Sequence, residues 1–493
     1  MSIVEFKNVF YIYPNNNKYA LENITFSVKK GEFFAVMGEN GAGKTTLCKL
    51  INGLIPHHCG GRLSGTVTVD GLNTVESTIP QLALKAGIVL DDPDAQLFTS
   101  SVRHEAAFGS ENLLLPPDEI EERITFALCA VGLKGYKERV PSTLSGGEKQ
   151  RLSIAAALAM KGKILVLDDP LCRLDPDGAQ EVITVLDDIR LKYQMTIIIV
   201  CGDSRKMAHY ADRVCLLNNG RVSAIDTADK IFSDSDLLEE NGIMPVKITE
   251  RIKINHTTQC EHQGDAGLLF RTDSLLKKPM IQVSNFSYRY ERSNININNI
   301  NLTIYENDFI AVMGKNGCGK TTLLKNITGL LKPSGGDIYI RGRNTKELTV
   351  ADISKEVGFV MQNPDTQLFT DSVYNETAFA LKNLRLSKKE ISQRVKDALN
   401  IVGLHDETAF PHALSRPDRI MTIIASVLAM GCRIIILDEV DAGNDYRGSL
   451  KIMNIARELH SKGFTIVFVT HNIYLADNFA HRLVKMERDY IYE

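Results

Sequence analysis

The sequence predicts an α/β protein in which one domain occurs twice. "AVMGENGAGKTTLCKLINGL" from Ala35 matches "AVMGKNGCGKTTLLKNITGL" from Ala311, an offset of 276 residues. "GIVLDDPDAQLFTSSVRHEAAF" from Gly87 matches "GFVMQNPDTQLFTDSVYNETAF" from Gly358, an offset of 271 residues. The offset drifts by only a few residues, as loop insertions would produce, so the pattern indicates a duplicated domain. In each copy strand patterns alternate with helix patterns, which predicts a parallel sheet covered by helices.

The elements follow the same order in both copies. Each copy starts with a strand-like segment, "SIVEFKNVFYIY" at 2–13 and "MIQVSNFSYRY" at 280–290. A buried strand then leads into a glycine-rich loop and an apolar helix. Later come an alanine-rich helix, a strand rich in Ile, Leu and Val that ends in aspartate, and another strand of this kind.

The domain boundaries follow from where these patterns stop. We expect a first domain over 1–246, which includes a small tail, a linker over 247–279 and a second domain over 280–493. The linker is polar and lacks apolar periodicity. It contains His256, Cys260 and His262, which leaves a metal site open as an alternative to a solvated linker.

Composition excludes several classes of protein. The chain of 493 residues is 44% hydrophobic and 24% charged, as in ordinary globular proteins. The net charge of −3 gives no bulk attraction to nucleic acid. No apolar run reaches the roughly 18 residues of a membrane span. The nine scattered cysteines indicate reduced thiols, and the absence of an apolar leader predicts a cytoplasmic protein. Any link to a membrane must then pass through a partner.

A phosphate-binding motif, GxxxxGK[ST], occurs at the same place in both copies, as "GENGAGKT" and "GKNGCGKT". Each follows a buried strand and opens a helix, which is the context that the motif requires and which disfavours a chance glycine-rich turn. The backbone N–H groups and the helix N-terminus would surround phosphate oxygens. Lys44 and Lys320 would hold the β- and γ-phosphates, and Thr45 and Thr321 would bind Mg²⁺.

Two strands end in pairs of acids, "ILVLDD" at Ile164–Asp169 and "IIILDE" at Ile434–Glu439. The first acid of each pair, Asp168 or Asp438, can hold Mg²⁺ through water, and the second can orient an attacking water. Such a pair is weak as an isolated signal but strong after a phosphate loop.

With "LSGGEKQR" at Leu144–Arg151, each copy resembles an ABC-type ATPase domain, a P-loop NTPase fold with a parallel-sheet core, an antiparallel β-subdomain and a helical subdomain. The resemblance covers the chain except for the linker. It implies that two domains face each other head to tail, with ATP between the phosphate loop of one and the Leu-Ser-Gly-Gly segment of the other. It also implies that Gln362 senses Mg²⁺ and the γ-phosphate, that Glu439 is catalytic, that His471 is the switch histidine, and that Asp175 and Asp445 lie in the following loop. The ATP-binding residues implied are Tyr13 and Tyr290 against adenine, Gly38, Asn40, Gly41, Gly43, Lys44, Thr45, Thr46, Gly314, Asn316, Gly317, Gly319, Lys320, Thr321 and Thr322 in the phosphate loops, and Ser145, Gly146, Gly147 and Glu148 in the signature segment.

The two copies depart from the family pattern in different places. The first has Asp91, Asp169 and Gly202 where the second has Gln362, Glu439 and His471. The second has Arg416 and Pro417, in "LSRPDR", where the first has Gly146 and Gly147. Arg416 adds a long side chain, and Pro417 lacks a backbone N–H.

Head-to-tail pairing within the chain would gather these departures into one site. The catalytic residues Gln362, Glu439 and His471 of the second copy would then face the intact "LSGGE" of the first. The altered residues Asp91, Asp169 and Gly202 of the first copy would face "LSRPD" of the second. We therefore expect one hydrolytic site and one site that holds ATP. Pairing of like copies across two chains would leave every site broken. Independent drift and an inactive protein are the remaining alternatives.

The stretch "PDAQLF…AAF", repeated as "PDTQLF…TAF", resembles the ATPases of energy-coupling-factor (ECF) importers for vitamins or metal ions. That resemblance implies a peripheral protein on the cytoplasmic face of the membrane, with a transmembrane coupling subunit and a membrane subunit that binds substrate. Glu105 and Glu376 would dock the coupling subunit, unless they belong to a solvated acidic surface. A tandem ATPase acting on ribosomes or nucleic acid, and the tandem ATPase of a sugar importer, are the alternatives.

Overall fold

The computed structural model describes residues 2–172, 174–246, 278–290, 296–384, 386–487 and 490–492. The chain divides into two compact units, Met1–Thr258 and Gln259–Glu493, so the division falls inside the segment expected to be a linker. His256, Cys260 and His262, the linker residues considered for a metal site, lie outside the described residues. Within the described ranges no helix is long and apolar enough to cross a membrane.

Each unit is built on a six-stranded sheet that is parallel except at one edge. The two sheets have the same strand order, and the antiparallel pair is β9 with β10 in the first and β19 with β20 in the second. In the first unit the sheet order is β10 (Arg221–Thr227), β9 (Arg213–Asn218), β3 (Phe33–Met37), β8 (Thr196–Val200), β7 (Ile164–Asp168) and β6 (Ala86–Val89). In the second unit it is β16 (Val357–Val360), β17 (Ile434–Asp438), β18 (Thr465–Val469), β13 (Phe309–Met313), β19 (Arg482–Met486) and β20 (Ile491–Tyr492).

The central strands are continuous apolar runs because both faces of the sheet are covered. Along β3, Phe33 and Ala35 face one core cluster, while Phe34 and Val36 face the other. Side chains alternate between the two faces of a strand, so a strand buried on both sides has no polar positions. The run "IIIL" before Asp438, in β17, is apolar throughout because that strand is also buried on both faces.

A four-stranded antiparallel sheet covers one side of each parallel sheet and contributes to its core. Its strands in the first unit are β2 (Leu21–Lys29), β1 (Ser2–Ile12), β4 (Arg62–Val69) and β5 (Leu72–Asn73), in sheet order. In the second unit they are β12 (Asn296–Tyr305), β11 (Pro279–Arg289), β14 (Gly335–Ile340) and β15 (Arg343–Asn344).

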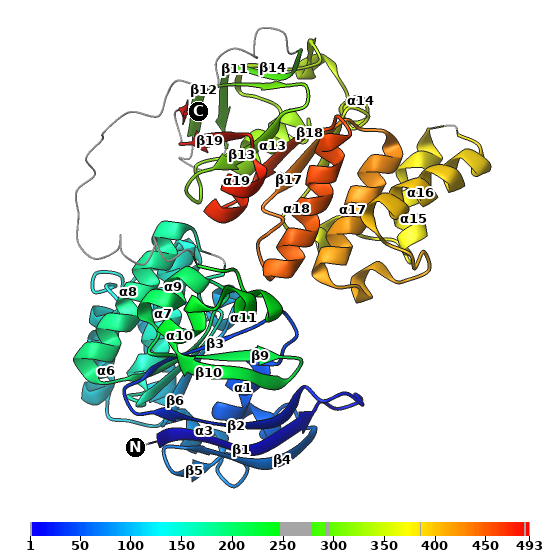
Figure 1. The fold of residues 1–493 in the computed structure, drawn as a ribbon. Coiled ribbons are helices and arrows are strands. Elements are labelled where there is room, and N and C mark those ends of the chain that lie inside the picture. The colour runs from blue at the N-terminus through cyan, green and yellow to red at the C-terminus, as the bar shows by residue number, and fades with distance from the viewer. Residues whose placement is uncertain are drawn as a thin grey trace. The chain divides into compact units, whose positions relative to one another are not determined.

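Helices complete each unit (Figure 1). In the first unit they are α1 (Lys44–Ile51), α2 (Leu54–His57), α3 (Ile79–Ala83), α4 (Pro93–Gln96), α5 (Val102–Asn112), α6 (Pro117–Ala130), α7 (Gly146–Ala159), α8 (Pro176–Tyr193), α9 (Ser204–Tyr210), α10 (Ala228–Ser233) and α11 (Ser235–Glu240). In the second unit they are α13 (Lys320–Ile327), α14 (Val350–Ile353), α15 (Val373–Ala378), α16 (Lys388–Val402), α17 (Arg416–Met430), α18 (Tyr446–Ser461) and α19 (Ile473–Phe479).

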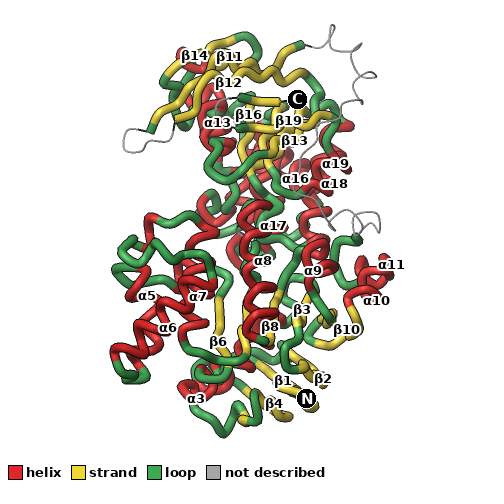
Figure 2. The backbone as a smooth tube through the Cα atoms, turned by 90° about the vertical axis from the view of Figure 1, so that its left-hand side faces the viewer, coloured by secondary structure: helices red, strands yellow, loops and turns green. Residues whose placement is uncertain are grey.

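A cluster of helices lies to one side of the sheets in each unit. Helices α5, α6 and α7 pack against one another, as Figure 2 shows, and α15, α16 and α17 do the same. Each unit therefore has the parallel core, the antiparallel subdomain and the helical subdomain that the sequence predicts, and the predicted fold class is confirmed.

Candidate functional site

The two phosphate loops have the same backbone geometry. Each loop leaves a central strand and ends where a helix begins, at Lys44 in α1 and at Lys320 in α13. Gly43 and Gly319 precede these lysines with φ of 102° and 107°, a left-handed conformation that glycine adopts readily. A Cβ on Gly43 would lie 2.6 Å from the carbonyl oxygen of Ala20. The glycines therefore allow the loop to pack closely against its own unit.

Both lysines donate hydrogen bonds back into their loops. Lys44 Nζ lies 2.8 Å from the carbonyl oxygen of Gly38 and 2.7 Å from that of Glu39. Lys320 Nζ makes the same contacts to Gly314 and Lys315, at 2.8 and 3.1 Å. Asn40 and Gly41 lie in the first loop, and Asn316 and Gly317 occupy the same places in the second. The side-chain ammonium groups of Lys44 and Lys320 are therefore held against the phosphate loops by backbone carbonyl oxygens.

Two tyrosines connect the antiparallel sheets to the phosphate loops. The hydroxyl of Tyr13 lies 3.1 Å from Thr46 Oγ1, and that of Tyr290 lies 2.8 Å from Thr322 Oγ1. The ring of Tyr13 is partly exposed and packs edge-on against Tyr11. Both tyrosines therefore lie beside a phosphate loop, which is where an adenine-stacking residue is expected.

In the second unit the predicted catalytic residues form one connected cluster. Gln362 Nε2 donates to Glu439 Oε2 over 2.8 Å, and His471 Nε2 lies 3.2 Å from Glu439 Oε1. Lys320 Nζ lies 3.7 Å from the same Glu439 oxygen and 3.3 Å from His471 Nε2. Three loops that are far apart in the sequence therefore meet around one carboxylate.

The charges of this cluster keep Glu439 ionised. Burial raises the pKa of the Glu439 carboxyl, but the hydrogen bond and charge of His471 and the ammonium of Lys320 outweigh burial and hold the pKa below its usual value. Beside it, burial raises the pKa of Asp438 to about 6, although Thr321 donates a hydrogen bond to it over 3.3 Å.

The first unit lacks this cluster although its backbone is alike. Asp169 and Glu439 both have left-handed backbones, with φ of 48° and 47°, an uncommon conformation for residues other than glycine. Burial raises the pKa of Asp169 to about 6, with Lys44 opposing the shift and Asp168 and Asp91 adding to it. Gly202 offers no side chain, and a Cβ placed there would meet nothing within 4 Å. Within the described ranges no hydrogen bond joins the side chains of Asp91 and Asp169.

Asp168, the other metal-binding candidate of the first unit, lies at the end of β7. It is buried, and burial raises its pKa while a hydrogen bond from Thr45 lowers it. Thr45 and Asp168 thus occupy the same places in the first unit, at a helix start and a strand end, as Thr321 and Asp438 in the second.

The signature segment "LSGGE" begins helix α7. Ser145 caps the helix by accepting from Glu148 N, and Glu148 Oε2 accepts from Ser145 N over 2.8 Å. A Cβ on Gly146 would lie 3.6 Å from Leu174 Cδ2, and one on Gly147 would lie 3.8 Å from the Cα of Gly178. Both distances are ordinary contacts, so the fold of the first unit itself does not require glycine at either position.

The corresponding segment of the second unit begins α17 with Arg416 and Pro417. Arg416 Nη2 donates to the carbonyl oxygen of Gln362 over 2.8 Å. Its guanidinium also lies beside Gly443, where an added Cβ would be 3.4 Å from Arg416 Nε. The side chain is therefore engaged with its own unit, a contact that the sequence did not reveal.

Asp175 and Asp445 cap the helices that follow the acid pairs. Asp175 Oδ1 accepts from Gly178 N over 2.8 Å at the start of α8, and Asp445 Oδ1 accepts from Gly448 N over 2.7 Å at the start of α18. The "DAGND" loop also contains Asp441, whose Oδ2 accepts from Thr470 Oγ1 over 2.6 Å. Asp441 therefore supports the loop that carries His471, and no sequence signal pointed to it.

Glu105 and Glu376 differ from their expected role as exposed docking acids. They are only 5% and 7% exposed. Glu105 Oε2 accepts from the backbone N–H groups of Phe98 and Thr99, and Glu376 Oε2 accepts from those of Phe369 and Thr370. The carboxylates are buried because they satisfy these backbone donors, so they shape the preceding loop instead of facing solvent.

The loops that Glu105 and Glu376 hold expose aromatic side chains to solvent. Phe98 and Phe369 are 67% and 63% exposed. Each packs edge-on against a second exposed phenylalanine, Phe108 at 4.9 Å and Phe379 at 4.7 Å between ring centroids. The four rings form two equivalent pairs, one in each unit.

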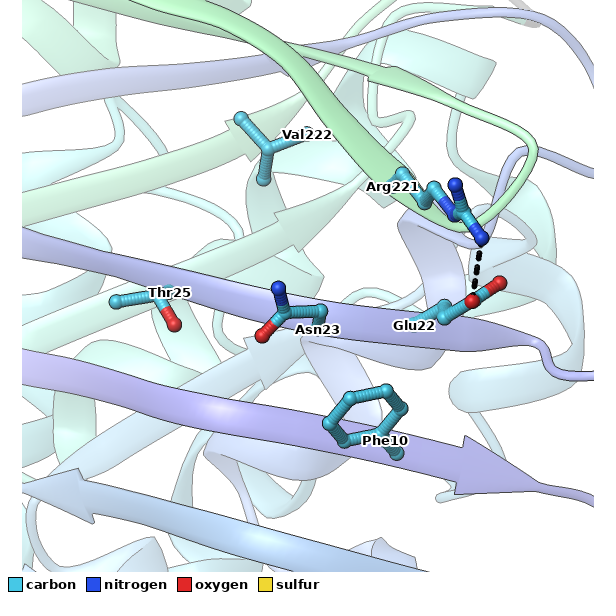
Figure 3. Close-up of a pocket in the computed structure, with 6 residues that line it drawn as sticks. All are labelled: Phe10, Glu22, Asn23, Thr25, Arg221 and Val222. Carbon is cyan, nitrogen blue, oxygen red and sulfur yellow. Dashed lines mark hydrogen bonds and ion pairs between the residues drawn. The ribbon is translucent and has the colours of Figure 1, made fainter.

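A separate hollow of about 380 Å³ lies between β1, β2 and β10 of the first unit (Figure 3). Phe10, Asn23 and Thr25 line it together with an ion pair between Arg221 and Glu22. None of the ATP-binding residues predicted from the sequence lines this hollow, so it is not part of the nucleotide site.

The fold and the phosphate loops define a P-loop ATPase duplicated within one chain. The family model described as ABC transporter matches residues 21–172 and 297–442. An ABC transporter ATP-binding protein of Caldanaerobacter subterraneus subsp. tengcongensis is 36% identical over 95% of this chain and 87% of its own length. One of Methanosarcina mazei is 34% identical over the whole of this chain and 94% of its own length.

A solved structure of cbiO1 from Clostridium perfringens, described as part of the ABC transporter complex cbiONQ, is 34% identical. It covers 48% of this chain and 94% of its own, with a TM-score of 0.44. From the family match and the two relatives, the chain belongs to the ABC transporter family. It is an ATP-binding protein with two ABC domains, in which ATP hydrolysis is coupled to transport.

Proposed function

We propose that this chain is the ATPase of a membrane importer and that only one of its two ATP sites hydrolyses. The observation that carries the proposal is the cluster of Gln362, Glu439 and His471 around Lys320. The first unit keeps the phosphate loop and its lysine but has no equivalent cluster in the described residues. The two sites therefore differ in the step that activates water, while both retain the groups that hold phosphate.

In the hydrolytic site Glu439 accepts a proton from, or orients, the attacking water. Its ionised carboxylate is fixed by Gln362 on one oxygen and by His471 on the other, so it requires little reorganisation before reaction. Lys320, whose ammonium donates to the carbonyl oxygen of Gly314 in the phosphate loop, would hold the β- and γ-phosphates. Asp169 in the first unit is one methylene shorter, and a misplacement of about 1 Å can cost about a hundredfold in rate.

The residues present fit Mg²⁺. Thr321 Oγ1, at the start of a helix, lies 3.3 Å from Asp438 Oδ1, at the end of a strand. Thr45 and Asp168 stand at the equivalent positions of the first unit. Hydroxyl and carboxylate oxygens are the ligands that Mg²⁺ prefers. When bound, the ion would neutralise negative charge on the phosphates, and Gln362 would complete its surroundings.

We further propose that each ATP is bound between the phosphate loop of one unit and the signature segment of the other. The glycines of the first signature support this arrangement, because their own unit would tolerate a Cβ at either position. Their absence of side chains is then explained by close approach of a nucleotide from outside the unit. In this arrangement the hydrolytic site contains Lys320 and Ser145. The other site, the retaining site, holds ATP without hydrolysing it and contains Lys44 and "LSRPD".

ABC ATPases generally pair with transmembrane subunits, and the two aromatic pairs give this chain a surface for such a partner. Phe98 with Phe108 and Phe369 with Phe379 are exposed apolar groups at matching positions, which is typical of interaction sites. The buried carboxylates of Glu105 and Glu376 fix the loops that carry Phe98 and Phe369. In this proposal the chain lies at the cytoplasmic face of the membrane, bound to a coupling helix at each pair.

The particular type of importer is proposed from the "PDxQLF…AF" stretches, which resemble ECF importers for a vitamin or metal ion. A separate membrane subunit would then bind the substrate. Purification of the full chain from detergent extract tests this: two kinds of membrane subunit should co-purify. Co-purification with a ribosome would favour a soluble tandem ATPase, and a substrate-binding site inside the coupling subunits would favour a sugar importer.

A further inference from the structure

We propose that Arg416 is a positioning residue for hydrolysis in its own unit, because it fixes the loop that carries Gln362. This inference rests on the proposed function, in which the pocket built on Lys320 is the one that hydrolyses. It assigns Arg416 a role beyond the loss of a signature glycine.

The first observation is the set of segments that Arg416 joins. Arg416 is the first residue of α17, and its Nη2 donates to the carbonyl oxygen of Gln362 over 2.8 Å. Its guanidinium lies beside Gly443, which follows Glu439 in the loop after β17. One side chain thus connects the helical subdomain to the two loops that supply Gln362 and Glu439.

The second observation is that the neighbouring loop provides room for this side chain. Gly443 has a left-handed backbone with φ of 74°, and a Cβ there would lie 3.4 Å from Arg416 Nε and 3.5 Å from Cζ. In the first copy the residues at these two positions are Gly146 and Arg173, the reverse arrangement, and Arg173 lies outside the described residues. The second unit therefore combines an arginine on the helix with a glycine on the loop.

The consequence reaches the reacting site in two steps. Arg416 holds the backbone of Gln362, and the side-chain amide of Gln362 holds Glu439 Oε2 over 2.8 Å. Small displacements of a group that orients an attacking water are costly, because the catalytic geometry is then formed less often. Loss of Arg416 should therefore lower kcat more than it raises the KM for ATP.

The competing interpretation predicts that kcat does not fall when Arg416 is lost. If Arg416 only obstructs the retaining site, its removal opens that site and leaves the rate equal or higher. Replacement by alanine distinguishes the two, because it removes both the guanidinium and the obstruction.

The experiment measures kcat and KM for ATP with the purified full chain and its Arg416→Ala and Arg416→Lys variants. We expect Arg416→Ala to lower kcat about tenfold, equivalent to about 1.4 kcal/mol, with KM changed less than about twofold. Arg416→Lys should recover at least about half of the parent kcat, because an ammonium can also donate to the carbonyl of Gln362. Hydrogen exchange of residues 361–368 should quicken in the alanine variant and return towards the parent rate in the lysine variant.

Arg419→Ala is the matched control. Arg419 also joins α17 to the same loop, through an ion pair with Asp365, but among the described residues it makes no hydrogen bond to the carbonyl oxygen of Gln362. We expect its kcat to change less than about twofold. An unchanged or raised kcat in Arg416→Ala, or an equal loss in Arg419→Ala, would overturn the inference alone. If Glu439→Gln retained full activity, the proposed function would fail and this inference with it.

Discussion

Replacement of Glu439 by glutamine should abolish ATP hydrolysis while the fold and ATP binding remain. Glutamine has nearly the same shape, but an NH₂ group, which only donates, replaces one of the two carboxylate oxygens. The side chain can then no longer accept from Gln362 Nε2 on one side and face His471 Nε2 with a second oxygen on the other, as Glu439 does over 2.8 and 3.2 Å. The negative charge that balances the ammonium of Lys320 is also lost. A positioned general base contributes about 10²- to 10⁴-fold, so we expect the rate to fall at least about a hundredfold.

The matched variant is Asp169→Asn, at the equivalent position of the first unit. If that site only retains ATP, the steady-state rate should fall less than about twofold. Phosphate release by the full chain measures both rates. Because the chain has no tryptophan, Tyr290→Trp and Tyr13→Trp each introduce a single fluorescent reporter of nucleotide binding at one site. Equal losses of activity in Glu439→Gln and Asp169→Asn would refute the asymmetry.

Three further outcomes follow from the described contacts. Gly146→Ala should lower ATPase activity about tenfold, with a melting temperature within about 4 °C of the parent, because a Cβ there meets Leu174 Cδ2 at an ordinary 3.6 Å; a parallel loss of activity and melting temperature would contradict the close-approach role. Glu105→Ala leaves two backbone donors without their acceptor, and an unfolding free energy that falls by less than about 1 kcal/mol would count against its structural role. Serine in place of Phe98 and Phe369 should weaken co-purification of a membrane partner without lowering basal ATPase activity, and undiminished capture would remove these residues from the docking surface.

Much of the fold could be predicted because its main signals are short, continuous stretches of sequence that occur in both copies. "GKNGCGKT" after a buried strand specifies a loop, a helix start and the place of Lys320 in a single stretch. Continuous apolar strands such as β17 predict a sheet covered on both faces, as found. The pairing of Thr321 with Asp438 follows from the same edge of that sheet.

The remaining features depend on tertiary contacts that no local pattern encodes. Glu105 reads as a surface acid on a short helix, yet it is buried because the preceding loop turns its N–H groups toward the carboxylate. From the sequence, Arg416 only indicates that a signature glycine has been replaced. In the structure its side chain donates to the carbonyl oxygen of Gln362, 54 residues earlier in the sequence. Asp441 likewise supports the His471 loop through Thr470, a partner on another strand end.

The central claim is that the Lys320 site is completed by the signature segment of the same polypeptide. A photo-crosslinking amino acid in place of Ser145, in a Glu439→Gln chain loaded with ATP and Mg²⁺, tests it most directly. With a mixture of isotopically heavy and light chains, mass spectrometry should find adducts within Gly314–Thr321 that join segments of the same label. Adducts in Gly38–Thr45, or adducts that join heavy to light chains, would contradict the account.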